Sequence, residues 1–231
     1  MKRGLVCLAA VLPLLAADRK ADDIKRIDAA TTDLIEIMHA KDGGIPETLM
    51  QKAECVGIIP GAKRAGFIVG VDYGKGIITC RIHDTNRWSA PAFIQVQGGS
   101  FGLQIGAGET DVVFTVMNES GVRKLLKDKV QLGVDVAGMA GPVGRNVQAN
   151  TDVLMRAEML SWSRARGVFA GVDLKGATLH TDHDDDVALY GPDVTHMELL
   201  RGKVPRPAAA ERLYRELERY AHKPVATKTG D

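Results

Sequence analysis

The sequence predicts an α+β fold with a mainly antiparallel β-sheet core, sandwich-like or barrel-like, flanked by N-terminal and C-terminal helices. Two observations lead to this class. Patterns typical of helices occur at both ends of the chain, and the long middle part alternates apolar and polar residues with the period of β-strands. Strands that follow one another with few helices between them favour an antiparallel sheet over βαβ units. With 231 residues, 45% of them hydrophobic, the chain can bury one substantial core.

Residues 1–17 have the layout of a secretory signal peptide. Lys2 and Arg3 precede an apolar run at residues 4–17, which is short for a membrane span of about 20 residues. We therefore expect an exported protein, periplasmic or envelope-associated, and leave open whether the segment is cleaved or kept as an anchor. In an oxidising compartment Cys55 and Cys80 could form a disulfide, but the sequence carries no distance, so their pairing also stays open.

An amphipathic helix is expected at residues 22–40, because Ile27, Leu34 and other apolar residues recur on one face. Its polar face mixes acidic residues with Lys25 and Arg26. A helix lying on a membrane surface would carry mostly Lys and Arg on that face. The pattern therefore favours a helix packed on the sheet.

A second helix and a β-hairpin follow. The helix is expected at residues 46–53. The hairpin is expected from strand-like runs at residues 56–59, 67–71 and 77–82, with Pro60-Gly61 ending the first run and Gly74-Lys75-Gly76 as a turn.

Residues 88–117 contain three further strand-like runs, at 92–96, 101–105 and 112–117, punctuated by glycines. Each run has the usual length of a strand. Together they predict a sheet meander.

The segment Gly98–Gly102 matches the G-x-S-x-G pattern of serine hydrolases, with Ser100 as the nucleophile and Asp173 and His180 as available partners. In α/β-hydrolases a helix must follow the serine. Here Gly102, Gly106 and Gly108 follow the serine within eight residues, and each would cost about 1 kcal/mol inside a helix. Serine hydrolysis is therefore only an alternative, and no catalytic residue is assigned.

The remaining elements are predicted from the same helix-like and strand-like spacing of apolar residues. Expected elements are a helix at 119–127 capped by Asn118, strands at 130–139, 153–162 and 167–174, short helices at 182–190 and 194–200, and a helix at 208–221.

An acidic cluster at residues 180–186 contains His180, His183 and four aspartates. Such a cluster could hold a divalent ion, or it could be the acidic first turn of a helix. The spacing of an EF-hand or of H-E-x-x-H is absent from the sequence. We therefore expect no metal and no cofactor, and leave the role of the cluster open.

Four basic residues of the β-rich part, Lys63, Arg64, Lys75 and Arg81, are the candidates for contact with an anionic lipid headgroup. The alternative is that they are scattered over a solvated surface. The formal net charge of +1 lacks the basic excess of a general nucleic-acid binder, so no nucleic-acid partner is expected.

A set of motifs in this order resembles the SYLF-domain family, the lipid-binding domain of endocytic adaptors, which also includes a yeast actin-binding member and exported bacterial relatives. The motifs are Pro60–Phe67, Tyr73–Gly76, Trp88–Phe93, Gly98–Gly106, Asp111–Asn118, Ala140–Arg145, Ser161–Val172 and Tyr190-Gly191. The resemblance covers residues 22–202 and leaves residues 203–231 as a C-terminal helix and tail. It implies binding of lipid, especially phosphoinositide, without catalysis, and a structural role for Ser100.

The sequence thus predicts a non-enzymatic module of the cell envelope that binds phosphatidylinositol or another anionic phospholipid through Lys63, Arg64, Lys75 and Arg81. Actin is not an expected partner, because a signal peptide places the chain outside the cytoplasm. The alternatives are a serine hydrolase using Ser100, and a structural envelope protein acting through protein partners. The identity of the lipid and the oligomeric state stay open.

Overall fold

The computed structural model describes residues 11–40, 44–65, 71–82, 85–98, 109–143, 154, 156–165 and 168–222. For residues 11–17, 64–65 and 71–72 it describes the backbone alone. The helices are α1 (Val11–Met38), α2 (Glu47–Lys52), α3 (Glu119–Leu125), α5 (His183–Tyr190), α6 (His196–Leu200), the 3-10 helix η2 (Ala208–Ala210) and α7 (Glu211–Tyr220). The strands are β1 (Cys55–Ala65), β2 (Val71–Cys80), β3 (Ala92–Gln97), β4 (Glu109–Val116), β5 (Lys129–Gln131), β6 (Gly138–Ala140), β7 (Met159–Ala165), β8 (Val168–Gly171) and β9 (Thr178–Thr181).

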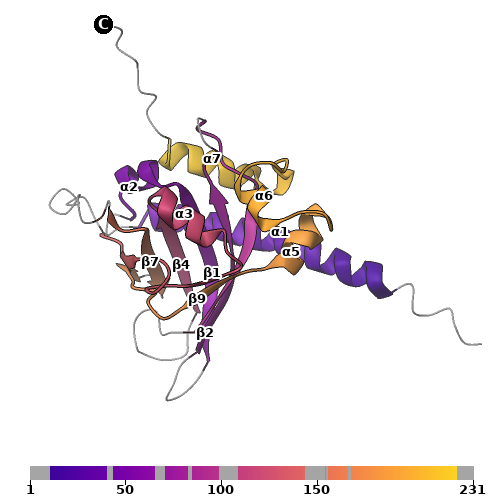
Figure 1. Cartoon of the computed structure of the whole chain (residues 1–231), viewed down its shortest axis with the longest axis horizontal. Coiled ribbons are helices and arrows are strands. Elements are labelled where there is room, and N and C mark those ends of the chain that lie inside the picture. Colours follow the sequence, from indigo (N-terminus) through magenta and orange to yellow (C-terminus); the bar gives the residue numbers. More distant parts are fainter. Residues whose placement is uncertain are drawn as a thin grey trace, which may run out of the picture.

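The strands form one curled sheet in the order β5-β9-β3-β2-β1-β4-β7-β6, with β8 also paired to β7 (Figure 1). Neighbouring strands are antiparallel except for the parallel pair β6 and β7. The predicted α+β class, with a mainly antiparallel sheet flanked by N-terminal and C-terminal helices, is confirmed.

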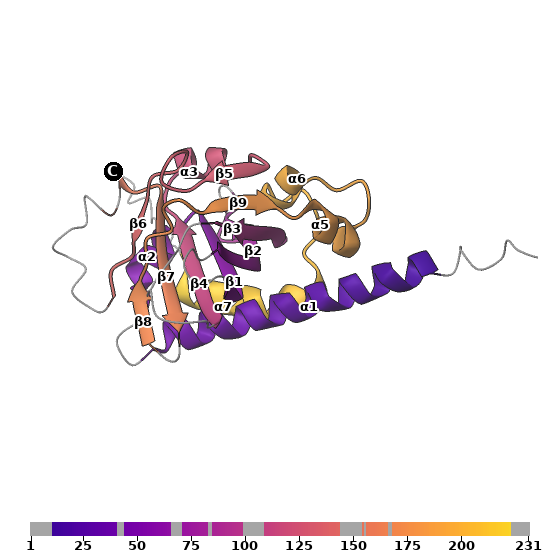
Figure 2. The same cartoon turned by 90° about the horizontal axis from the view of Figure 1, so that it is seen from below.

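Helices cover both faces of the sheet, so the protein has two apolar cores (Figure 2). On one face, α1 and α7 lie side by side, and Ile27 and Leu34 of α1 pack with Leu213 of α7 against the strands. On the other face, Leu125 of α3 and Leu199 of α6 belong to the second core. The predicted amphipathic helix therefore packs on the sheet, as its mixed polar face indicates. No helix in the described part of the chain is long and apolar enough to cross a membrane.

β1 continues through Pro60-Gly61, where the sequence predicts that the strand ends, so this prediction is wrong. The register between β1 and β2 shifts between Ile58 and Lys63, and the register between β1 and β4 shifts in the same region. A bulge of this kind accepts a proline, which has no N–H to donate, and Gly61 takes a φ of +55° there. The strand bends at this point but does not stop.

Gly74-Lys75-Gly76, predicted as a turn, lies inside β2, so this prediction is also wrong. A Cβ atom on Gly74 would lie 2.6 Å from Cγ2 of Ile59, and one on Gly76 would collide with the backbone of Ile58. These glycines are needed because β1 approaches β2 closely, not because the chain turns. The hairpin predicted around this turn, between residues 67–71 and 77–82, is therefore wrong, because Val71 and residues 77–80 lie in the same strand. The hairpin that forms pairs β1 with β2 in antiparallel, and its connection lies outside the described residues.

The predicted meander at residues 88–117 is wrong in its pairing. β3 and β4 form where runs 92–96 and 112–117 were expected, but the hairpin of β1 and β2 lies between them in the sheet. β3 pairs with β2, and β4 pairs with β1. The expected middle strand, at residues 101–105, lies outside the described residues.

Residues 130–139 do not form one strand, although they alternate in sequence. β5 ends at Gln131, Gly133 takes a φ of +83°, and β6 begins at Gly138. The side chain of Asp135 accepts a hydrogen bond from the N–H of Gln131 at 2.7 Å, which closes the turn. Val134 is 71% exposed, although the alternating pattern places it among the residues expected to face the core. The expected strands at 153–162 and 167–174 correspond to β7 and β8, with β7 beginning only at Met159.

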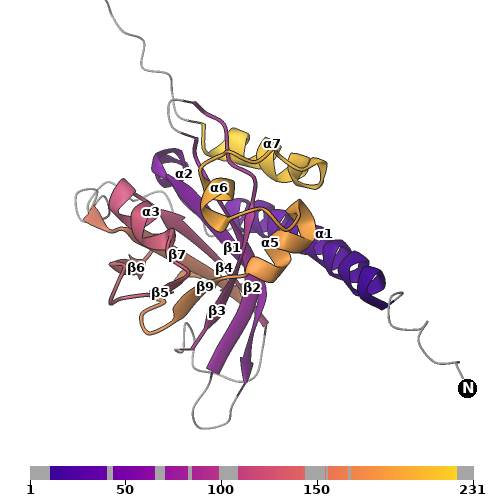
Figure 3. The same ribbon diagram turned by 45° about the vertical axis from the view of Figure 1, so that its right-hand side comes forward.

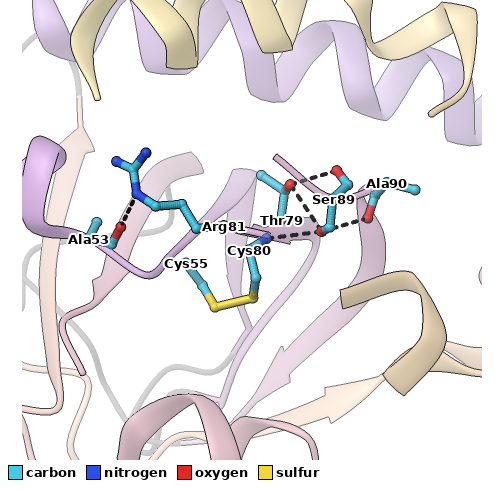
Figure 4. Close-up of a disulfide and its surroundings, with 7 residues drawn as sticks. All are labelled: Ala53, Cys55, Thr79, Cys80, Arg81, Ser89 and Ala90. Atoms are coloured by element: carbon cyan, nitrogen blue, oxygen red, sulfur yellow. Dashed lines mark hydrogen bonds between the residues drawn. A yellow bond between two sulfur atoms is a disulfide. The ribbon is translucent and has the colours of Figure 1, made fainter. Parts of the chain in front are cut away.

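Cys55 of β1 and Cys80 of β2 are direct partners across the hairpin and form a disulfide (Figure 4). The sequence left this pairing open. The disulfide joins residues 25 positions apart. A disulfide that closes a loop of this length stabilises a fold by about 3 kcal/mol, mainly because it restricts the unfolded chain.

Candidate functional site: a charged groove beside the first helix

Two adjoining hollows lie along α1, where this helix passes the hairpin of β1 and β2 and the start of α5. The first, of about 420 Å³, is called here the cationic hollow, and its charged lining is Lys25, Arg26, Lys63, Lys75 and Asp22. The second, of about 740 Å³, is called the acidic hollow, and its charged lining includes Asp22, Asp23, Asp184 and Asp185 together with Arg19, Arg26 and Lys75. Because Asp22, Arg26 and Lys75 line both, the two hollows form one groove.

Between the hollows lies a set of five charged side chains, the inner charge cluster: Asp23, Arg26, Lys75, Asp182 and Asp185. Nζ of Lys75 lies 2.6 Å from Oδ2 of Asp182 and 2.8 Å from Oδ2 of Asp185. Nη1 of Arg26 lies 2.7 Å from Oδ2 of Asp185 and 3.2 Å from Oδ1 of Asp23. The side chains of Asp182 and Asp185 are only 5% and 3% exposed, so the carboxylates of these pairs are shielded from water.

Three elements bring the inner charge cluster together. Lys75 lies in β2 between the two glycines that allow close packing with β1. Asp182 and Asp185 lie at the start of α5, which packs beside α1 and β3 (Figure 3). Carboxylates are favourable at the N-terminus of a helix. The acidic cluster whose role the sequence left open thus neutralises Arg26 and Lys75, and no group of residues suited to a metal ion occurs in the described ranges.

Burial changes the pKa values of the acids in this cluster. Burial, with the nearby charge of Asp185, raises the pKa of Asp23 to about 7. Burial also raises the pKa of Asp182. For Asp185 burial acts in the same direction, but the hydrogen bonds from Lys75 and Arg26 outweigh it and lower the pKa. Asp185 is therefore the permanent anion of the cluster, and Asp23 changes its charge near neutral pH.

Lys25 and Lys63 form the outer edge of the cationic hollow and are called here the rim lysines. Lys25 is paired with Asp22 at 2.9 Å and Lys63 with Glu109 at 3.5 Å, and the two lysine side chains are 76% and 73% exposed. Exposed pairs of this kind contribute about 0–1 kcal/mol. An incoming anion can therefore displace the carboxylates at little cost.

Of the four basic residues predicted to bind lipid, Lys63 and Lys75 meet in the cationic hollow. Arg64 follows Lys63 in β1, opposite Asp72, and its side chain lies outside what the structure describes. Sequence interpretation missed Lys25 and Arg26 as members of the site. Their position on the polar face of an amphipathic helix is the signal that could have suggested them.

Arg81, the fourth predicted residue, lies elsewhere and is 7% exposed. Its guanidinium donates a hydrogen bond to the carbonyl oxygen of Ala53 at 3.0 Å (Figure 4). It also donates to the carbonyl oxygens of Gln51 at 3.2 Å and of Ala221, and it lies 4.6 Å from the ring centre of Trp88. Ala53 and Ala221 are the C-caps of α2 and α7. Arg81 thus joins the ends of two helices beside the disulfide and does not face the groove.

Farther along α1 a second, partly buried charge cluster connects this helix to the sheet. Nη2 of Arg164 lies 3.3 Å from Oδ1 of Asp33 and 2.8 Å from Oδ2 of Asp111, and Arg164 also pairs with Glu36. Asp111 accepts a hydrogen bond at 3.0 Å from the N–H of Gly61, at the bulge of β1. Burial, with the charge of Asp111, raises the pKa of Asp33 to about 7.

Of the three residues of the alternative hydrolase interpretation, Asp173 and His180 lie in the described part of the chain. Ser100 lies outside the described residues. Asp173 accepts a hydrogen bond at 2.9 Å from the N–H of Lys175 in its own loop. His180 lies in β9, between partners in β3 and β5.

Comparison with known proteins gives a consistent result. A family model described as "Ysc84: Las17-binding protein actin regulator" matches residues 97–220. The chain is 36% identical over 176 residues to "SH3 domain-containing protein PJ696.02" of Schizosaccharomyces pombe, which covers 75% of this chain and 40% of that protein. It is 33% identical over 186 residues to human "SH3 domain-containing YSC84-like protein 1", covering 80% and 54%. It is 33% identical over 180 residues to "Protein YSC84" of Saccharomyces cerevisiae, covering 77% and 38%. The chain spans about half the length of the curated relatives it matches, or less.

Proposed function

The chain belongs to the Ysc84 family, the SYLF-domain family that its motifs resemble, and from this membership we propose that it is a non-enzymatic module that binds an anionic phospholipid surface. The description of the family names binding and regulation, and neither that description nor the names of the relatives mention a reaction. For this chain we propose a lipid partner in the cell envelope and propose neither Las17 nor actin.

The observation that carries the proposal is the cationic hollow, where four basic residues surround about 420 Å³ and one acid accompanies them. A Lys or Arg near an anionic membrane contributes about 1 kcal/mol to binding. The rim lysines are held only by exposed partners, so they can exchange a carboxylate for a lipid phosphate. Tyr73, 42% exposed, lies opposite Lys63 in the hairpin and also lines the hollow, where an amphipathic ring suits a membrane interface.

The proposal divides the predicted lipid-binding residues by role. Lys63 would contact the headgroup, and no role is assigned to Arg64, whose side chain lies outside what the structure describes. Lys75 is held by two shielded carboxylates and would form the floor of the hollow. Arg81 would contribute only through the fold, because its guanidinium is bonded to the ends of α2 and α7.

The test is co-sedimentation with vesicles of phosphatidylcholine alone and with added anionic phospholipid. Replacing Lys25→Gln and Lys63→Gln together should weaken binding roughly thirtyfold, since each lysine contributes about 1 kcal/mol. A matched control is Arg123→Gln with Lys127→Gln, which removes the same charge from exposed positions of α3 and the turn after it, on the other face of the sheet. Equal losses in the two double variants would contradict the site. Failure of the wild type to bind any vesicle would contradict the function and favour protein partners.

Export through residues 1–17 remains part of the proposal. Cleavage after Ala17 would leave α1 beginning at Asp18, and an acidic residue in the first turn suits the helix dipole. The mass of the protein purified from its own cells distinguishes the processed chain from the complete one.

A further inference from the structure

The groove along α1 carries charge of opposite sign at its two ends. In the cationic hollow four basic residues accompany the single acid Asp22. In the acidic hollow four acids accompany three basic residues. A ligand with several phosphates suits the first hollow but would be repelled at the second. A ligand that carries a phosphate next to a positive charge suits both.

The acids of the acidic hollow differ in the ion-pair and hydrogen-bond partners that they already have. Asp184 is 74% exposed at the mouth and pairs with Arg19 at 2.9 Å, a surface contact that a ligand can replace at little cost. Asp23 lines the same hollow, its residue is 0% exposed, and its Oδ2 has no hydrogen-bond partner among the described residues. A buried carboxylate oxygen without a donor is unfavourable. A positive charge placed in the acidic hollow would offset this cost.

We propose that the groove binds an aminophospholipid headgroup, with the phosphate at the rim lysines Lys25 and Lys63 and the primary ammonium in the acidic hollow near Asp184. The inference rests on the proposed lipid-binding function and names the headgroup class that the site prefers. The shared chemistry is a phosphate diester joined to an ammonium, which occurs in phosphatidylserine and phosphatidylethanolamine and also in soluble glycerophosphoethanolamine. We assign the lipid form, because a membrane adds the attraction of its surface to that of one headgroup.

The first experiment compares vesicles in which phosphatidylcholine carries the same fraction of phosphatidylserine or of phosphatidylglycerol. These two lipids give the surface the same net charge, but only phosphatidylserine has an ammonium. The wild type should bind phosphatidylserine vesicles about two- to fivefold more tightly, the factor that one exposed ion pair supplies. Equal binding to the two kinds of vesicle would overturn the inference and leave the proposed function intact. Binding to neither would overturn the proposed function.

The variant Asp184→Asn separates recognition of the ammonium from general electrostatics. Removing a negative charge should strengthen binding to every anionic vesicle if the surface acts only through net charge. If Asp184 contacts the ammonium, the variant should lose the preference for phosphatidylserine while binding phosphatidylglycerol as well as the wild type or better. Asp184 is exposed at the start of α5, so the variant should fold. A preference that persists in Asp184→Asn would overturn the assignment.

Two controls complete the test. Asp193→Asn removes the same charge from an exposed turn between α5 and α6, outside both hollows, and should keep the preference of the wild type. Glycerophosphoethanolamine added in solution distinguishes the two sources of the headgroup. Weak competition supports the lipid assignment, whereas competition at concentrations as low as those of the vesicle lipid would overturn it in favour of a soluble ligand.

Discussion

The rim lysines and the inner charge cluster line the same groove, yet their cations have different environments. Lys25 and Lys63 pair with carboxylates that are themselves largely exposed. Lys75 and Arg26 pair with carboxylates that are almost completely buried. Removing one partner of a buried ion pair lowers the free energy of unfolding by several kcal/mol, because the remaining charge is left buried without a partner. We infer that Lys75 and Arg26, the cations of the inner charge cluster, stabilise the fold, and that the rim lysines are available to a ligand.

The largest expected effect that tests this comparison is the response of stability to pH. Asp23 and Asp33, both on α1, have pKa values raised to about 7, whereas in the unfolded chain such acids titrate near 4. Between these values the folded state binds more protons than the unfolded state. The free energy of unfolding should therefore fall as the pH rises from about 4 to about 7. Asp185 and Glu158 have lowered pKa values, so they affect stability at lower pH. Their contribution to the free energy of unfolding is lost as the pH falls below about 4.

Urea unfolding at several pH values measures this response. The double variant Asp23→Asn with Asp33→Asn should show a much smaller fall above pH 4, because neither side chain can ionise. Asp28→Asn is the control on the same helix, since Asp28 is exposed and pairs with Arg212. A fall as steep in the double variant as in the wild type would show that these acids are not kept protonated by the fold.

Arg81→Met should produce the next largest effect, a loss of about 3 kcal/mol in the free energy of unfolding. Methionine keeps much of the apolar stem, but the carbonyl groups at the ends of α2 and α7 lose their shared donor. Denaturant unfolding gives the loss, and vesicle binding of the folded variant should remain that of the wild type. Reduced lipid binding by a fully folded Arg81→Met would place this residue among the ligand contacts after all.

Lys75→Met is expected to lower the free energy of unfolding by about 2 kcal/mol. The loss is smaller than for breaking a fully buried ion pair, because this lysine is one-third exposed. Lys63→Gln, the matched change at the rim, should alter the free energy of unfolding by less than about 0.5 kcal/mol. In a double-mutant cycle, Lys75→Met combined with Asp185→Asn should cost less than the sum of the single changes. Similar losses for Lys75→Met and Lys63→Gln would remove the distinction between inner and rim cations.

The helices and strands show where sequence interpretation succeeded. α2, α3 and the C-terminal helices lie close to the predicted ranges, because their caps and apolar faces are local features. α1 ends near the predicted end, but it begins at Val11, eleven residues before the predicted start at residue 22. Asn118, for example, caps α3 by accepting a hydrogen bond from the N–H of Gly121 at 3.0 Å. The glycines of β2 misled the interpretation, since a glycine required by a neighbouring strand has the same appearance in sequence as one required by a turn.

Taken alone, the sequence determined the fold class, the family and the presence of basic residues in the β-rich part, because periodicity and motifs are carried by neighbouring positions. Only the tertiary structure decided which strands pair, that Cys55 and Cys80 are linked, and which cations are free to meet a ligand. Lys75 and Asp185 lie 110 positions apart, and no local pattern relates them. The physical reason is that the environment of a charge depends on its burial and on the partner that packing brings to it, and both are set by distant parts of the chain.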